Sequence, residues 1–167
     1  TAKTIIFSEN EIDKLEAWAK RVHSAIDVRK PSIHFADYES LGYYKHLGHP
    51  SRWRLRKAIE QGLVSAIRLG DRRLESFGRC VVLRTAQWAL DGRSKHTTVD
   101  EFRDFLTITA AEMVEGAREL RTAVKANGGH RSTIEVFNRS AAGLEGDKRL
   151  QGWRAPRLVV TSPPYPG

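Results

Sequence analysis

The sequence has one cysteine, no long apolar run and no Gly-x-Gly tripeptide. The single cysteine excludes an internal disulfide framework, and no Cys/His spacing matches a zinc site, so no metal is expected. No run approaches 18 apolar residues, and the first residues lack the pattern of a signal peptide. These absences favour a cytoplasmic protein without a membrane segment.

The positive charge that the chain does carry is concentrated in one stretch. The formal net charge is +8, and residues 52–95 hold eleven Lys/Arg against four Asp/Glu, an excess of seven. A local excess of this kind predicts a polyanionic partner, because cations that neutralise phosphates release counterions. We therefore predict contacts with the phosphates of double-stranded DNA from Arg52, Arg54, Arg56, Lys57, Arg72, Arg73 and Arg79. A solvated, arginine-rich helical surface is the alternative.

Helix start signals divide the first 127 residues. Ser8 with Glu11, and Thr98 with Glu101, have the spacing of capping boxes, and apolar residues repeat at helical spacing after both pairs. Asp71 is placed to cap a third helix, whose apolar residues also recur at helical spacing. These signals predict three amphipathic helices.

Shorter helical segments are expected between these helices. Ser51 is placed to cap a helix that Gly62 would end, and residues 37–47 have the composition of a short helix. Trp53 and Trp88 are interpreted as core residues rather than stacking surfaces for bases. Cys80 is interpreted as a buried, inert thiol, and loop or surface positions are expected for His34, His46 and His49.

The pattern changes after a glycine-containing break at residues 126–130. "STIEVFN" at 132–138 and "RLVV" at 157–160 are typical of short strands, the second of a strand covered on both faces. Strand, crossover, strand is the pattern of an open α/β sheet, whose ligands bind at the carboxyl ends of its strands. The expected architecture is therefore mainly α, with a helical domain at 1–127 and a partial α/β segment at 131–167.

The second expected strand leads into "TSPPYPG". Pro163 and Pro164 fix the backbone and remove two N–H donors, which leaves carbonyls and the Ser162 hydroxyl to accept hydrogen bonds from an amino group. Tyr165 adds a flat ring one step further on. A rigid acceptor edge beside an aromatic ring suits the exocyclic amino group of a flipped-out base.

"LVVTSPPY" resembles the catalytic motif of the AdoMet-dependent DNA amino-methyltransferases, which methylate cytosine N4 or adenine N6. Its Ser-Pro-Pro-Tyr form is similar to that of the cytosine-N4 branch. The resemblance implies a Rossmann-like sheet, S-adenosylmethionine as co-substrate and direct attack of the amino nitrogen on its methyl group. It also implies that Ser162 and the Pro163 carbonyl hold the target amino group while Tyr165 stacks on the base. The family's cofactor-binding turn falls on Ser140, where the family usually has an acid, and Asp147 is the alternative.

The family's glycine-rich AdoMet loop and its ribose-binding acid do not occur in this sequence. The resemblance therefore implies an internal segment, with a helical insertion before the partial catalytic segment. The remainder of the methyltransferase would lie elsewhere in a full-length chain or in a partner chain. The favoured function is methyl transfer to cytosine N4 in DNA, and the alternatives are a non-catalytic helical DNA-binding module and a helical protein-interaction module.

Overall fold

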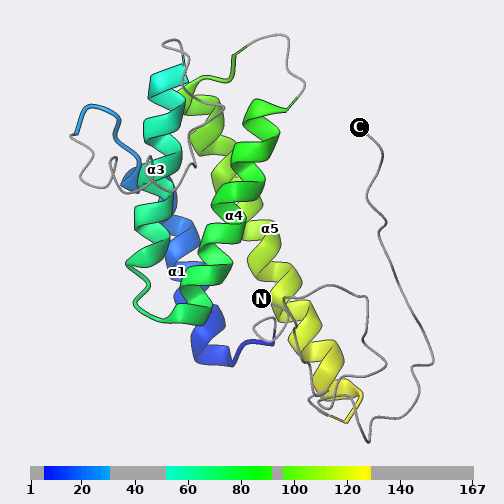
Figure 1. Cartoon of the computed structure of the whole chain (residues 1–167). Coiled ribbons are helices and arrows are strands. Elements are labelled where there is room, and N and C mark those ends of the chain that lie inside the picture. The colour runs from blue at the N-terminus through cyan, green and yellow to red at the C-terminus, as the bar shows by residue number, and fades with distance from the viewer. Residues whose placement is uncertain (1–5, 31–51, 92–95, 129–167) are drawn as a thin grey trace, which may run out of the picture. The chain divides into compact units, whose positions relative to one another are not determined.

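The structure is a computed structural model that describes residues 6–30, 52–91 and 96–128. These residues form the helices α1 (Glu9–Ala25), α3 (Trp53–Ile67), α4 (Arg72–Leu90) and α5 (Val99–Ala126), labelled as in Figure 1. The prediction of a mainly α chain is confirmed for this part, and its residues contain no strand that could belong to a Rossmann-like sheet. The segments 132–138 and 157–160, and the helix expected at 37–47, lie outside the described residues.

Three helices begin where the capping signals predict. In α1, Glu11 N–H donates to Ser8 Oγ (3.3 Å) and Ser8 N–H donates to Glu11 Oε2 (2.7 Å), which completes a capping box. Thr98 and Glu101 form the same reciprocal pair at the start of α5. Asp71 Oδ1 accepts hydrogen bonds from the second and third backbone N–H groups of α4, at 2.8 and 3.1 Å. These two hydrogen bonds lower the pKa of Asp71 below its ordinary value.

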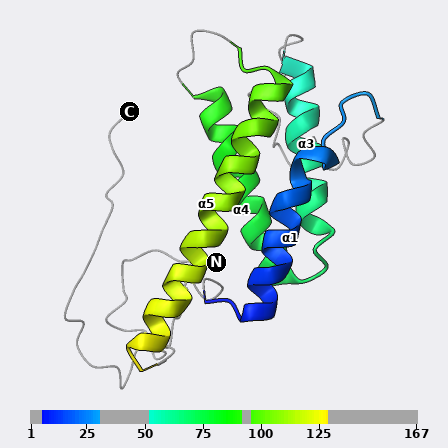
Figure 2. The same ribbon diagram turned by 180° about the vertical axis from the view of Figure 1, so that it is seen from behind.

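The four helices are neighbours in a ring, and each runs antiparallel to the next (Figures 1 and 2). The α1–α3 pair shows the direction: the Trp18 indole N–H donates to Ser65 Oγ (3.0 Å), and Gln61 Nε2 donates to the carbonyl of Asp27 (2.7 Å). The contact therefore moves back along α3, from Ser65 to Gln61, as the chain advances from Trp18 to Asp27, which shows that the two helices are antiparallel. The described helices form an up-down-up-down bundle, in which the largest packing surfaces join α1 to α5, α3 to α4 and α4 to α5.

Apolar side chains from all four helices fill the space between them. Each helix has one buried stripe at helical spacing, as the sequence periodicity predicts. The largest of these side chains that are almost fully inaccessible to solvent are Ile12, Leu15, Ile26, Leu74, Leu106 and Phe102. The bundle is therefore held together mainly by burial of apolar surface.

The prediction that Gly62 ends its helix is wrong. Gly62 is buried inside α3, which continues to Ile67, and a Cβ added to it would lie 3.1 Å from Val82 Cγ1 of α4. Gly78 of α4 lies just as close to α3, because its added Cβ would be 2.8 Å from the Cβ of Ala66. These glycines allow the two helices to approach each other. The residue with a left-handed backbone after α3 is Gly70, with φ of 71°.

Alanine at Gly78 is expected to lower the free energy of unfolding by about 1–3 kcal/mol, because overpacking at a close contact forces the helices apart. Gly116 in α5 is the matched control, since its added Cβ would meet nothing within 4 Å. Gly116→Ala is expected to stabilise the protein by about 0.5–1 kcal/mol, the ordinary gain in a helix interior. Urea denaturation measures both. Equal stabilisation by the two substitutions would contradict the close α3–α4 contact.

Candidate nucleic-acid interface

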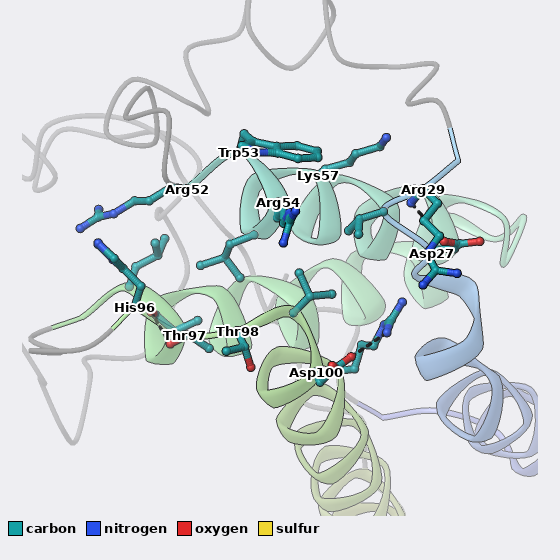
Figure 3. A pocket seen from close by; sticks show the side chains of 16 residues that line it. Asp27, Arg29, Arg52, Trp53, Arg54, Lys57, His96, Thr97, Thr98 and Asp100 are labelled. Atoms are coloured by element: carbon teal, nitrogen blue, oxygen red, sulfur yellow. Dashed lines mark hydrogen bonds and ion pairs between the residues drawn. The ribbon is translucent and has the colours of Figure 1, made fainter.

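A cavity of about 1080 Å³ lies at the end of the bundle where α1 and α4 finish and α3 and α5 begin (Figure 3). Its walls come from the residues after α1, the first turn of α3, the last residues of α4 and the start of α5. Figure 3 shows Arg52 and His96 on one side of the cavity and Asp27 and Arg29 on the other. The cavity is formed jointly by segments that are far apart in the sequence.

Among the described residues that line this cavity, positive side chains outnumber negative ones. The acidic side chains that line it are Asp27 and Asp100, and the basic ones are Arg29, Arg52, Arg54, Lys57 and Arg103. Arg103 is already engaged, since it pairs with Asp100 (2.8 Å) and donates to the Ile26 carbonyl at the end of α1. Within the described residues, the other four cations form no ion pair with a carboxylate. The cavity therefore has an excess of positive charge that these side chains leave unneutralised.

The start of α3 adds to this positive potential. The other described helices begin with a side-chain cap and have acidic residues in the first turn, whereas α3 has neither. Its N-cap position is Arg52, whose side chain makes no capping hydrogen bond. The first N–H groups of a helix lack intrahelical partners and carry a partial positive charge. An anion in the cavity would thus meet both the guanidinium groups and the positive end of the α3 dipole.

Trp53, predicted to lie in the core, is instead 47% exposed at the rim of this cavity. It is the first residue of α3 and lies on the side of the helix away from the buried stripe, so the helical spacing relative to Leu55 and Ile59 could have placed it outside the core. The Arg54 guanidinium carbon lies 5.5 Å from the centroid of its ring, within the range of a cation–π contact. Trp88, the other tryptophan predicted to lie in the core, is partly buried and stacks on Phe105 with ring centroids 3.9 Å apart.

The seven predicted DNA-binding cations do not form one group. Arg52, Arg54 and Lys57 line the cavity, and Arg56 lies on the same helix outside the lining. Arg72, Arg73 and Arg79 belong to the first half of α4, and α4 begins at the opposite end of the bundle because it runs antiparallel to α3. The cavity instead includes Arg29 and Arg103, which the sequence analysis missed. No local signal could reveal them, because only the packing of α1 and α5 brings them to this end.

Arg73 has an intramolecular role. Its guanidinium donates to the Ile6 carbonyl (2.7 Å), pairs with Glu11 Oε1 (3.1 Å) and lies 5.3 Å from the ring centroid of Phe7. Burial raises the pKa of Glu11, but hydrogen bonds from Ser8 and the charge of Arg73 outweigh it and hold that pKa below its ordinary value. Arg73 therefore fixes the segment before α1 to α4, and its charge is already neutralised.

Several predicted residues fall outside the described ranges or differ from expectation. The cofactor and catalytic candidates and the three loop histidines lie outside the described residues: Ser140, Asp147, Ser162, Pro163, Pro164, Tyr165, His34, His46 and His49.

Cys80 is exposed, so the prediction of a buried thiol is wrong. It precedes the buried pair Val81 and Val82 and points away from the buried stripe of α4. Among residues 6–30, 52–91 and 96–128, no three His, Cys, Asp or Glu side chains are grouped to hold a metal ion.

Comparison of the chain with models of known protein families, with curated proteins and with solved structures gave no match. In the described ranges, none of the helices combines the length and the apolar character that crossing a membrane requires.

Arg73→Gln is expected to lower the free energy of unfolding by about 1–3 kcal/mol, because it removes a charged hydrogen-bond donor and leaves Glu11 without its cation. Arg54→Gln is the matched control: Arg54 is exposed and its unfolding free energy should change by less than about 0.5 kcal/mol. Chemical denaturation compares the two variants. Equal stability of Arg73→Gln and the wild type would show that the Arg73 contacts do not hold the segment before α1.

Proposed function

We propose that the helical bundle binds double-stranded DNA, and that it does so through the cations around the end cavity. The observation that carries the proposal is a group of cavity cations without an ion-pair partner among the described residues: Arg52, Arg54 and Lys57 at the start of α3, and Arg29 after α1 on the other side of the cavity. Phosphate is the anion that best fits such a group, because guanidinium groups bind it through two parallel hydrogen bonds.

The electrostatic repulsion among these cations favours binding of an external polyanion, which would reduce it. Like charges that folding brings together repel one another, and the positive end of a helix dipole adds to that repulsion. In α4 and α5, acidic side chains in the first turn reduce the same unfavourable potential, and in α3 the first turn carries basic residues instead. A DNA backbone would supply the missing negative charge along a line of regularly spaced phosphates.

We further propose that this chain is a segment of a longer protein that transfers a methyl group from S-adenosylmethionine to an exocyclic amino group of DNA, with cytosine N4 as the favoured atom. This part of the proposal rests on the resemblance of "LVVTSPPY" to the catalytic motif of the DNA amino-methyltransferases. Ser162 and the Pro163 carbonyl would accept hydrogen bonds from the amino group, Pro164 would keep this backbone rigid, and Tyr165 would stack on the base. The partial α/β segment would belong to a Rossmann-like sheet, with Ser140 or Asp147 near the cofactor.

In this proposal the bundle is an insertion that grips DNA beside the catalytic segment, and the remaining cofactor-binding parts come from elsewhere in the full-length chain or from a partner. The enzyme would act in the cytoplasm. The same cations would equally serve a non-catalytic DNA-binding module, so DNA binding and methyl transfer are tested separately.

DNA affinity is expected to depend on the cavity cations. Replacing Arg52, Arg54 and Lys57 together by Gln should weaken duplex binding and reduce the slope of log K against log salt by about 0.9 for each phosphate that the variant no longer neutralises. The matched control replaces Arg68, Arg72 and Arg84 by Gln, which removes the same charge from exposed positions outside the cavity. Fluorescence anisotropy between about 50 and 200 mM salt measures the slopes.

Equal weakening in the two triple variants would mean that only net charge matters, and the cavity would then not be the DNA site. An affinity that does not change with salt would contradict phosphate binding altogether.

Tyr165→Ala in the full-length gene product is expected to reduce methyl transfer strongly, because stacking of a base on an aromatic ring is worth about 1–3 kcal/mol. Ser162→Ala should be milder, since the Pro163 carbonyl would still accept one amino hydrogen. Affinity for S-adenosylmethionine should change little in both variants. The assay measures methyl transfer to DNA, and digestion of the product distinguishes N4-methylcytosine from N6-methyladenine. Wild-type transfer by Tyr165→Ala would rule out a catalytic role for "TSPPY".

A further inference from the structure

Trp53 differs from the other tryptophans of the described residues. Trp18 is buried and its indole N–H is bonded to Ser65, and Trp88 is partly buried against the ring of Phe105. Trp53 is 47% exposed and lies at the cavity rim, so about half of its surface is accessible to a ligand. A large, half-exposed aromatic surface is a common feature of binding sites, because its apolar area becomes buried when a ligand covers it.

The surroundings of Trp53 are cationic. Arg52 and Arg54 are its neighbours in the chain, Lys57 follows one turn later, and all three line the same cavity (Figure 3). The Arg54 guanidinium lies 5.5 Å from the ring centroid, so one cation is already associated with the ring. An aromatic surface next to several cations without acidic partners in the described residues matches the two parts of a nucleotide, a flat base and an attached phosphate.

A fully paired duplex offers phosphates to such a site, but its bases are stacked on one another and cannot stack on a protein ring. Trp53 would therefore contribute to binding only when a base is unstacked. The cavity, at about 1080 Å³, exceeds the usual size of a small-molecule site, so its volume does not exclude a nucleotide.

We propose that the rim of the end cavity binds an unstacked nucleotide, with its base on Trp53 and its phosphates on Arg52, Arg54 and Lys57. This inference rests on the proposed DNA binding and adds a contact to a base. The unstacked nucleotide comes either from single-stranded DNA or from an unpaired base within a duplex, and both present the same chemistry. Acidic peptides fit less well, because their carboxylates would pair with the cations but would not stack on the Trp53 ring.

The test compares probes that carry the same phosphates with and without bases. The first probe is an oligothymidine of about twelve residues, and the second is a fully abasic oligonucleotide of the same length. Wild-type protein should bind the oligothymidine about 5- to 150-fold more tightly than the abasic strand, which corresponds to one stacked base. Trp53→Ala should remove this preference, and Trp53→Phe should keep part of it.

Ile67→Ala is the matched control, because Ile67 is another exposed apolar residue of α3 but lies at the far end of the helix. It should leave the preference unchanged. Circular dichroism checks that every variant is folded. A third probe, a duplex with one unpaired thymidine, is compared with the fully paired duplex and shows which source of unstacked base the site uses.

The outcomes separate this inference from the DNA-binding proposal. Binding of paired duplex together with equal affinity for the oligothymidine and the abasic strand would overturn the base contact and leave DNA binding standing. A preference for bases that survives in Trp53→Ala would also overturn it. Failure of every oligonucleotide to bind would overturn both, as would tighter binding of polyglutamate than of any oligonucleotide.

Discussion

The close contact between α3 and α4 at Gly62 and Gly78 is the constraint on which the arrangement of this bundle depends. A side chain at Gly78 would overlap Ala66, and one at Gly62 would press against Val82, so the two helices approach only because both positions lack a Cβ. Four residues, Arg68 to Asp71, separate α3 from α4, which makes them antiparallel neighbours. The start of α3 is thereby placed beside the end of α4, and these two helix ends form part of the cavity wall.

Some of the positive charge around the cavity is paired within the protein, and the rest is available to a ligand. Arg103 joins the end of α1 to the start of α5 through the Ile26 carbonyl and Asp100, so its charge is used within the protein. Arg52, Arg54 and Lys57 at the start of α3 form no ion pair with a carboxylate in the described part of the chain. Burial of apolar surface along the four helices supplies the stability that tolerates this local repulsion. Unfavourable charge at one place is typical of sites that bind an oppositely charged ligand.

Sequence reasoning succeeded where the cause of a structure is local. Capping boxes depend on residues three positions apart, so Ser8 with Glu11 and Thr98 with Glu101 could be recognised in the sequence and are confirmed. It failed at Gly62, because the role of that glycine depends on Val82, twenty positions further along the chain and on another helix.

The candidate site could be predicted only in part for the same reason. The excess charge of residues 52–95 was visible, but its division between two ends of the bundle follows from the antiparallel packing of α3 and α4. Arg29 follows α1 and lines the cavity only because α1 packs against the other helices. The amino-acid composition carries no information about that packing. Arg73 was assigned to DNA from the local excess of positive charge, because its contacts with Ile6 and Glu11 depend on the tertiary fold and are not visible in the sequence.

The length of α5 has a consequence for local stability. Its 28 residues correspond to a helix of roughly 42 Å, against roughly 26 Å for the 17 residues of α1. Its last buried residue is Ala117, and beyond the core the described contacts that join it to α1 are ion pairs of Arg118 with Glu16 and of Arg121 with Glu9. The acidic partner of each pair is exposed, and such ion pairs contribute little and weaken as ions screen them. The free energy of local opening therefore decreases along α5, and its last turns fray more readily as ionic strength rises, while the first turns stay closed until the bundle unfolds globally.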